Sequence, residues 1–171
     1  NKRGLKRVEF DLRLQPEIGW GGDLMTARQY STGGWLAAFP VFEPHYQVLI
    51  SRGVASGTIQ LISLKGRDEV HTFQNATIYL EKNWGASFPS RWWWTQANTF
   101  PLVDLCVTAT GARRKLPLTN EEEEVALVAL HWNKEFLPFP NVEWTVRWGR
   151  WQVEGHYEDY KVTLTGLCSD E

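Results

Sequence analysis

The chain has 171 residues, of which 43% are apolar and 22% are charged, a composition that suits one globular domain with a substantial core. A formal net charge of −2 gives no general electrostatic reason to bind nucleic acid. Two cysteines, Cys106 and Cys168, are too few for a disulfide framework or a cysteine-rich zinc site. No apolar run reaches the length of a membrane-spanning helix.

Strand patterns begin close to the start of the chain. Charged and apolar residues alternate across residues 7–14, which is the period of a strand with one buried face. Two runs rich in β-formers, 46–55 and 58–64, are separated by Ser56-Gly57, which predicts a turn. A second turn is predicted over residues 65–68. The first half of the chain is therefore predicted to be an antiparallel meander.

The second half also reads as short strands that end at Gly, Pro, Asn or Asp. One segment has an alternative, because Thr119 and Glu122 resemble a capping box that would start a helix. We favour a strand there, since Asn133-Lys134 follows as a hairpin-like turn. The pattern predicts an all-β fold, either a barrel or a sandwich. The strands expected after the second turn are 70–81, 91–100, 102–110, 125–132, 144–151 and 160–167.

Residues 81–98 concentrate four tryptophans among charged and amide side chains, a mixture that indicates a binding site. Strand periodicity places one polar and aromatic stripe on each of two strands. If both stripes face the inside of a barrel, they line a cavity for a small molecule, with residues 84–89 as its rim. A plain hydrophobic core is the alternative. The first stripe comprises His71, Phe73, Asn75, Thr77, Tyr79, Glu81 and Asn83, and the second comprises Trp92, Trp94, Gln96, Asn98 and Phe100.

Glu81 favours the binding site over the core. A carboxylate among aromatic side chains loses hydration, which disfavours its charged form, so it is expected to be paired or functional. Lys82 points to the opposite face and is a poor partner. Arg91 is a candidate partner, and an ion pair with it would make the cluster structural.

The same residues resemble the tocopherol cyclase family. The resemblance extends from about Trp20 to Trp151, and family members continue at both ends, so residues 1–171 are expected to be a single β-barrel-like region within a longer protein. The central block is Glu81-Lys82-Asn83-Trp84-Gly85, followed by Phe88-Pro89, Arg91-Trp92, Trp94, Gln96 and Asn98. The flanking blocks are Gly34-Trp35-Leu36, Pro40-Val41-Phe42-Glu43-Pro44 with Gln47, Glu124-Val125-Ala126-Leu127 and Trp148-Gly149-Arg150-Trp151.

The resemblance implies a lipocalin-like β-barrel and a cyclase, independent of cofactors and metals, that closes the chromanol ring of vitamin E from a prenylated (phytyl) benzoquinol. That reaction protonates an alkene, develops tertiary-cation character and ends with attack by a phenolic oxygen. Glu81 is the predicted general acid, with Glu43 in reserve. His45 and His71 are weaker candidates for the proton acceptor. The predicted substrate contacts are Tyr79, Asn83, Trp84, Phe88, Trp92, Trp94, Gln96 and Asn98.

The resemblance also implies a hydrophobic small-molecule substrate and no nucleic-acid partner. It places the protein in the lipid-associated fraction of the plastid in a eukaryote, or in the cytoplasm or at the thylakoid in a cyanobacterium, and it is consistent with peripheral association with a membrane or lipid droplet. Two alternatives stay open. One is a non-catalytic lipocalin-like binder of an isoprenoid lipid or quinone. The other is a carbohydrate-binding β domain in which Trp92 and Trp94 stack on sugars and Glu43 and Glu81 form a carboxylate pair.

Overall fold

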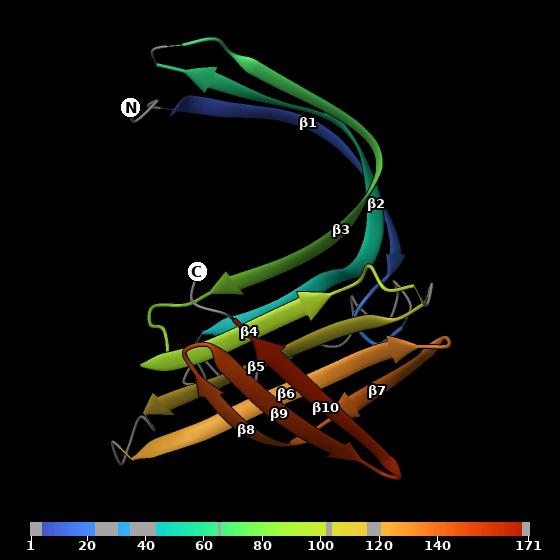
Figure 1. The fold of residues 1–171 in the computed structure, drawn as a ribbon, viewed down its shortest axis with the longest axis vertical. Helices are drawn as coiled ribbons and strands as arrows, with labels where there is room; N and C mark the ends of the chain where they lie inside the picture. Colours follow the sequence, from blue (N-terminus) through green and yellow to red (C-terminus); the bar gives the residue numbers. More distant parts are fainter. Residues whose placement is uncertain are drawn as a thin grey trace.

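The computed structural model describes residues 5–22, 31–34, 44–64, 66–101, 104–115 and 121–168. These residues form strands that pair antiparallel throughout, which confirms the predicted all-β class (Figure 1). Within these ranges no helix is long and apolar enough to cross a membrane. The strands are β1 (Leu5–Ile18), β2 (His45–Ser63), β3 (Glu69–Trp84), β4 (Arg91–Ala97), β5 (Cys106–Lys115), β6 (Glu122–Trp132), β7 (Glu135–Phe139), β8 (Asn141–Arg147), β9 (Arg150–Tyr157) and β10 (Tyr160–Leu167).

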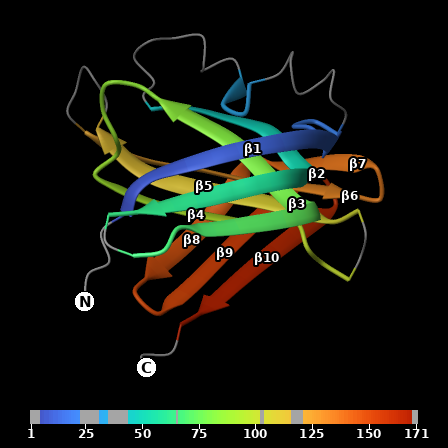
Figure 2. The same cartoon turned by 90° about the horizontal axis from the view of Figure 1, so that it is seen from above.

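The strands are arranged in three layers. The sheets have the orders β1-β2-β3, β4-β5-β6-β7 and β10-β9-β8. The β4–β7 sheet lies between the other two, and the long β1–β3 sheet curves away from it (Figures 1 and 2). None of these sheets closes on itself within the described residues. The lipocalin-like barrel is therefore not confirmed.

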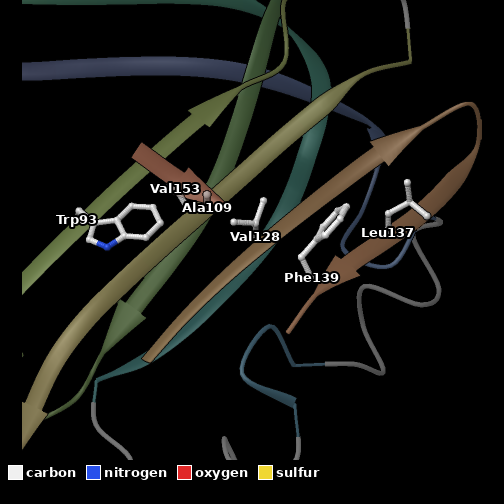
Figure 3. Packing of buried hydrophobic residues seen from close by; sticks show 6 residues of the cluster. All are labelled: Trp93, Ala109, Val128, Leu137, Phe139 and Val153. Atoms are coloured by element: carbon white, nitrogen blue, oxygen red, sulfur yellow. The ribbon is translucent and has the colours of Figure 1, made fainter. Parts of the chain in front are cut away.

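The two faces of the β4–β7 sheet have different roles because successive side chains point to opposite sides. One face packs on the β8–β10 sheet and forms the main core, which is shown in Figure 3. Its largest member is Trp93, 3% exposed, whose ring lies 5.9 Å from Trp144 and 5.7 Å from Trp151 between centroids. A Cβ at Gly111 would overlap the Trp93 indole. The opposite face points toward the β1–β3 sheet, where Ala129 packs with Val48.

The predicted turn at Ser56-Gly57 is wrong, since β2 runs through it as one strand. Gly57 adopts a φ of 149° at a point where a Cβ would overlap the backbone of Asp11 on β1. The glycine therefore allows two strands to approach closely instead of reversing the chain. Ser56 Oγ accepts a hydrogen bond of 3.0 Å from the backbone N–H of Asn75.

Asn75 also changes the predicted stripe on β3. Its φ is 53°, and the pairing with β2 shifts by one residue between Ala76 and Phe73. Such a bulge reverses the alternation of side chains on either side of it. Phe73 consequently lies on the face opposite to Tyr79, so the stripe is continuous only from Thr77 to Asn83.

Most of the remaining strand predictions are confirmed, and the two exceptions are the segment 144–151 and strand β7. Residues 122–132 form a strand and not the alternative helix, and Asn133 and Lys134 make the expected turn with φ values of 52° and 65°. The segment 144–151, predicted as one strand, is a hairpin that turns at Trp148-Gly149, where Gly149 has a φ of 78°. Strand β7 was not predicted.

Candidate active site

An open pocket of about 870 Å³ lies between the β1–β3 sheet and the β4–β7 sheet. The β1–β3 sheet contributes Tyr46, Glu81 and Asn83 to the lining, and Trp20, just after the end of β1, also lines the pocket. Most of the other wall is apolar. It comprises Phe88, Pro89, Trp92, Trp94, Ala112, Val125, Ala126, Leu127, Ala129, Phe136, Pro138 and Phe139, together with Thr110 and Arg114. A pocket of this size with few polar groups is typical of a small-molecule site.

Glu81 is held by three hydrogen bonds from side chains on β2 and β3. The phenols of Tyr46 and Tyr79 donate to Oε2 at 2.9 Å and 2.7 Å, and the amide of Asn83 donates to Oε1 at 3.3 Å. The two phenol oxygens are themselves 2.9 Å apart. Trp94 Nε1–H, from the facing sheet, donates to Tyr46 Oη at 3.2 Å. Within the described part of the chain, neither Lys82 nor Arg91 is paired with Glu81, so the arginine partner is not observed.

Both phenols stay protonated at every physiological pH. Burial raises the pKa of Tyr46 well above its usual value, and the neighbouring carboxylate of Glu81 raises it further. Burial also raises the pKa of Tyr79, with added contributions from Tyr46 and Glu81. A protonated phenol has one O–H to donate. Tyr46 and Tyr79 therefore present donors to Glu81, or to an oxygen that replaces one of their bonds.

The structure brings several of the predicted site residues together. Glu81, Asn83, Phe88, Trp92 and Trp94 line the same pocket, and Tyr79 lies directly behind Glu81. Trp92 is 64% exposed and Trp94 36% exposed, so both indole rings keep accessible surface in an open site.

Three predicted contacts lie elsewhere. Trp84 is on the other face of β3, where it stacks on His45 at 5.2 Å and lies 5.1 Å from Lys82 Nζ. Asn98 is buried and donates to the backbone carbonyls of Ser51 and Ile78, at 3.2 Å and 2.9 Å, which joins the two sheets. Gln96 is outside the lining. Glu43 lies outside the described residues.

Of His45, His71 and His131, one lines the pocket and two do not. His45 lines the pocket, whereas His71 is exposed and lies 3.6 Å from Glu69 on the protruding part of β3. His131 is 4% exposed and packs against Trp20 and Phe136. Burial lowers the pKa of His131 to about 4, so it is neutral at physiological pH. Among the residues that the structure describes, no group of three potential ligands could hold a metal ion.

Tyr46 and Arg114 are two of the pocket residues that sequence reasoning did not find. Tyr46 is the second residue of strand β2, and its register with Asn83 puts it beside Glu81. A pairing of the β2 and β3 patterns in antiparallel register would have found it. Arg114 belongs to β5 and lines the pocket. The alternation of residues 110, 112 and 114 along one strand is the signal that could have placed it.

Comparison with known proteins identifies the family. The profile described as tocopherol cyclase-like matches residues 1–171, so the chain belongs to the tocopherol cyclase-like family. It is 35% identical over 173 aligned positions to the probable chloroplastic tocopherol cyclase of Oryza sativa subsp. japonica and, equally, to the chloroplastic tocopherol cyclase of Zea mays. Each alignment covers 97% of this chain and 35% of the relative, so the chain spans about a third of their length. No solved structure matches significantly.

Tyr46→Phe tests the hydrogen-bond cluster independently of any activity. The change removes a donor to Glu81 and leaves the indole N–H of Trp94 without its acceptor. We expect the free energy of unfolding to fall by about 1–3 kcal/mol, measured from the urea midpoint at constant slope. The control is Tyr160→Phe, on an exposed strand position, which should change it by less than about 0.5 kcal/mol. Equal effects of the two variants would show that the cluster contributes nothing to stability.

Proposed function

We propose that the full-length protein is a tocopherol cyclase, which closes the chromanol ring of a prenylated benzoquinol. The observation that carries the proposal is Glu81, a carboxyl group that lies in an apolar, tryptophan-lined pocket and is oriented by two protonated phenols. The names of the rice and maize relatives support the same activity. The relatives favour neither the non-catalytic lipid binder nor the carbohydrate-binding domain.

In the proposed mechanism, Glu81 acts twice. As the acid, it transfers its proton to the less substituted carbon of the trisubstituted alkene, and positive charge develops on the tertiary carbon. The neighbouring phenolic oxygen then forms the C–O bond, and its proton goes to the carboxylate that Glu81 has become. The atoms balance and the enzyme is regenerated, so the reaction needs no cofactor. Tyr46, Tyr79 and Asn83 hold the carboxyl group in place during both transfers.

Trp92 and Trp94 stabilise the developing cation in this scheme. Each indole face can contribute about 0.5–2 kcal/mol to a cation placed over it. The two rings also exclude water, which would otherwise capture the cation and give an open-chain alcohol.

The setting of the reaction follows from the relatives and the substrate. Both relatives are named as chloroplastic, and we propose a plastid location for a eukaryotic form of this protein. A phytyl quinol partitions into lipid, so peripheral association with a membrane or lipid droplet would bring the pocket to its substrate. We also propose that the complete chain encloses the pocket in a lipocalin-like barrel.

The test is turnover of a phytyl benzoquinol by the purified full-length protein in D₂O without added cofactor. We expect a chromanol that carries one deuterium on the carbon next to the new C–O-bonded centre, because the acid proton exchanges with solvent before each turnover. A chromanol without deuterium would contradict alkene protonation by an exchangeable acid. Saturable binding of the quinol with no product would instead identify a non-catalytic binder.

A further inference from the structure

Arg114 brings a guanidinium to a wall of the pocket that is largely built from small and aliphatic residues. Its neighbours in the lining include Ala112 and Val125. Arg114 Nε and Nη2 donate to Oε2 of Glu123 at 3.0 Å and 2.9 Å, and the Arg114 side chain is 18% exposed. The paired carboxylate therefore fixes the guanidinium against the edge of an apolar site.

Arg113, the preceding residue, provides an internal comparison. Its guanidinium pairs with Glu124, and its side chain is 34% exposed. Adjacent residues of a strand point to opposite faces, so Arg113 lies on the face away from the pocket and is absent from the lining. The same two strands thus carry one arginine–glutamate pair on each face. Of these two arginines, only Arg114 lines the pocket.

The strand register places Arg114 relative to Glu81. Trp94 lies opposite Thr110 and Trp92 opposite Ala112, so Arg114 is one step further along the same face. Trp94 contacts Tyr46 of the Glu81 cluster. The Trp94 end of the stripe, which contacts the Glu81 cluster, lies opposite Thr110, and Arg114 is four residues further along β5, or about 13 Å from the Thr110 backbone. Trp92, which pairs with Ala112, lies within this interval, and Glu81 and Arg114 both line the pocket.

We propose that Arg114 binds the non-reacting oxygen of the quinol, which is para to the oxygen that closes the ring. This inference rests on the proposed cyclase function. The quinol ring lies along Trp92, with its reacting oxygen and alkene at Glu81 and its other oxygen accepting an N–H bond from Arg114. Glu123 is a positioning residue that orients the guanidinium. A quinol that accepts this charge-assisted hydrogen bond gains binding that a phenol without the second oxygen cannot gain, so the site discriminates against such phenols.

The experiment compares two substrates and two proteins. The substrates are the prenylated 1,4-benzoquinol and the matching monophenol, in which hydrogen replaces the non-reacting hydroxyl group. The proteins are the full-length wild type and Arg114→Met. We expect the change to lower kcat/KM for the quinol by about 10- to 100-fold and to leave that for the monophenol within about threefold. The cycle cancels the intrinsic difference in reactivity between the substrates.

Controls separate this inference from the proposed function. Arg113→Met removes the equivalent pair on the other face and should alter neither substrate, whereas Arg114→Lys should retain part of the preference because it keeps a cation without the planar fork. Equal losses on quinol and monophenol in Arg114→Met would overturn the inference while the cyclase function stands. If the wild type cyclises neither compound, the proposed function fails. Binding of each to wild type and Arg114→Met, followed by tryptophan fluorescence, then decides the role of Arg114.

Discussion

Glu81→Gln in the full-length protein is expected to lower the rate of chromanol formation by about 10²- to 10⁴-fold, the usual contribution of a positioned general acid or base. The amide cannot supply the proton that the alkene needs or accept the one that the phenol releases. Its oxygen can still accept the bonds from Tyr46 and Tyr79, and Asn83 can reverse its amide to accept from the new NH₂ group. The variant should therefore bind the quinol with an unchanged dissociation constant, and only kcat should fall.

The matched control for this prediction is Glu143→Gln, an exposed position on β8 outside the pocket lining. It makes the same chemical change and should leave both kcat and stability unaltered. Single-turnover measurements with saturating protein would separate chemistry from binding and product release. Glu81→Gln with wild-type kcat would remove Glu81 from the mechanism.

Local patterns in the sequence were sufficient to predict most strands and the opposite orientations of Trp92 and Trp93. Period-2 alternation reports which side chains share a face, and it does so reliably while the strand is regular. The alternation failed at Asn75, where a bulge reverses it. The turn predicted from the residue types of Ser56-Gly57 also failed, because the close approach of β1 requires a glycine within a continuous strand. Both depend on contacts with another strand, which no local pattern contains.

The candidate site shows the same division between local and non-local information. Glu81, Asn83, Trp92 and Trp94 lie within a short stretch whose composition marks it as unusual, and they line one pocket. Gln96 and Asn98 alternate with Trp92 and Trp94 along the chain and were therefore predicted to share their face. The Asn98 amide, however, donates to the backbone carbonyls of Ser51 and Ile78 and does not line the pocket. Tyr46 and Arg114 could be placed only from strand register, because their positions come from β2 and β5 and not from the motif.

Trp93→Ala is expected to lower the free energy of unfolding by about 3–5 kcal/mol, as other truncations of large buried aromatic residues do. The side chain is 3% exposed and packs between Trp144, Trp151 and the backbone of Gly111. The indole nitrogen has no hydrogen-bond partner among the described residues, so lost packing accounts for the whole effect. Gly111 cannot move its backbone into the cavity without breaking the β5–β6 ladder, which limits relaxation.

The comparison variant is Trp92→Ala, one residue away on the opposite face and 64% exposed. We expect its free energy of unfolding to change by less than about 0.5 kcal/mol. We expect kcat to fall because the activation free energy rises by the roughly 0.5–2 kcal/mol that the ring contributes to stabilising the cation. Urea unfolding of the purified full-length proteins, read at the transition in which the packed β4–β7 and β8–β10 sheets unfold, measures the change in stability. Turnover measures the change in kcat. The two tryptophans should thus separate stability from catalysis. A large stability loss in Trp92→Ala with none in Trp93→Ala would mean that the β4 face assignment is reversed, and the pocket described between the sheets would then be the core.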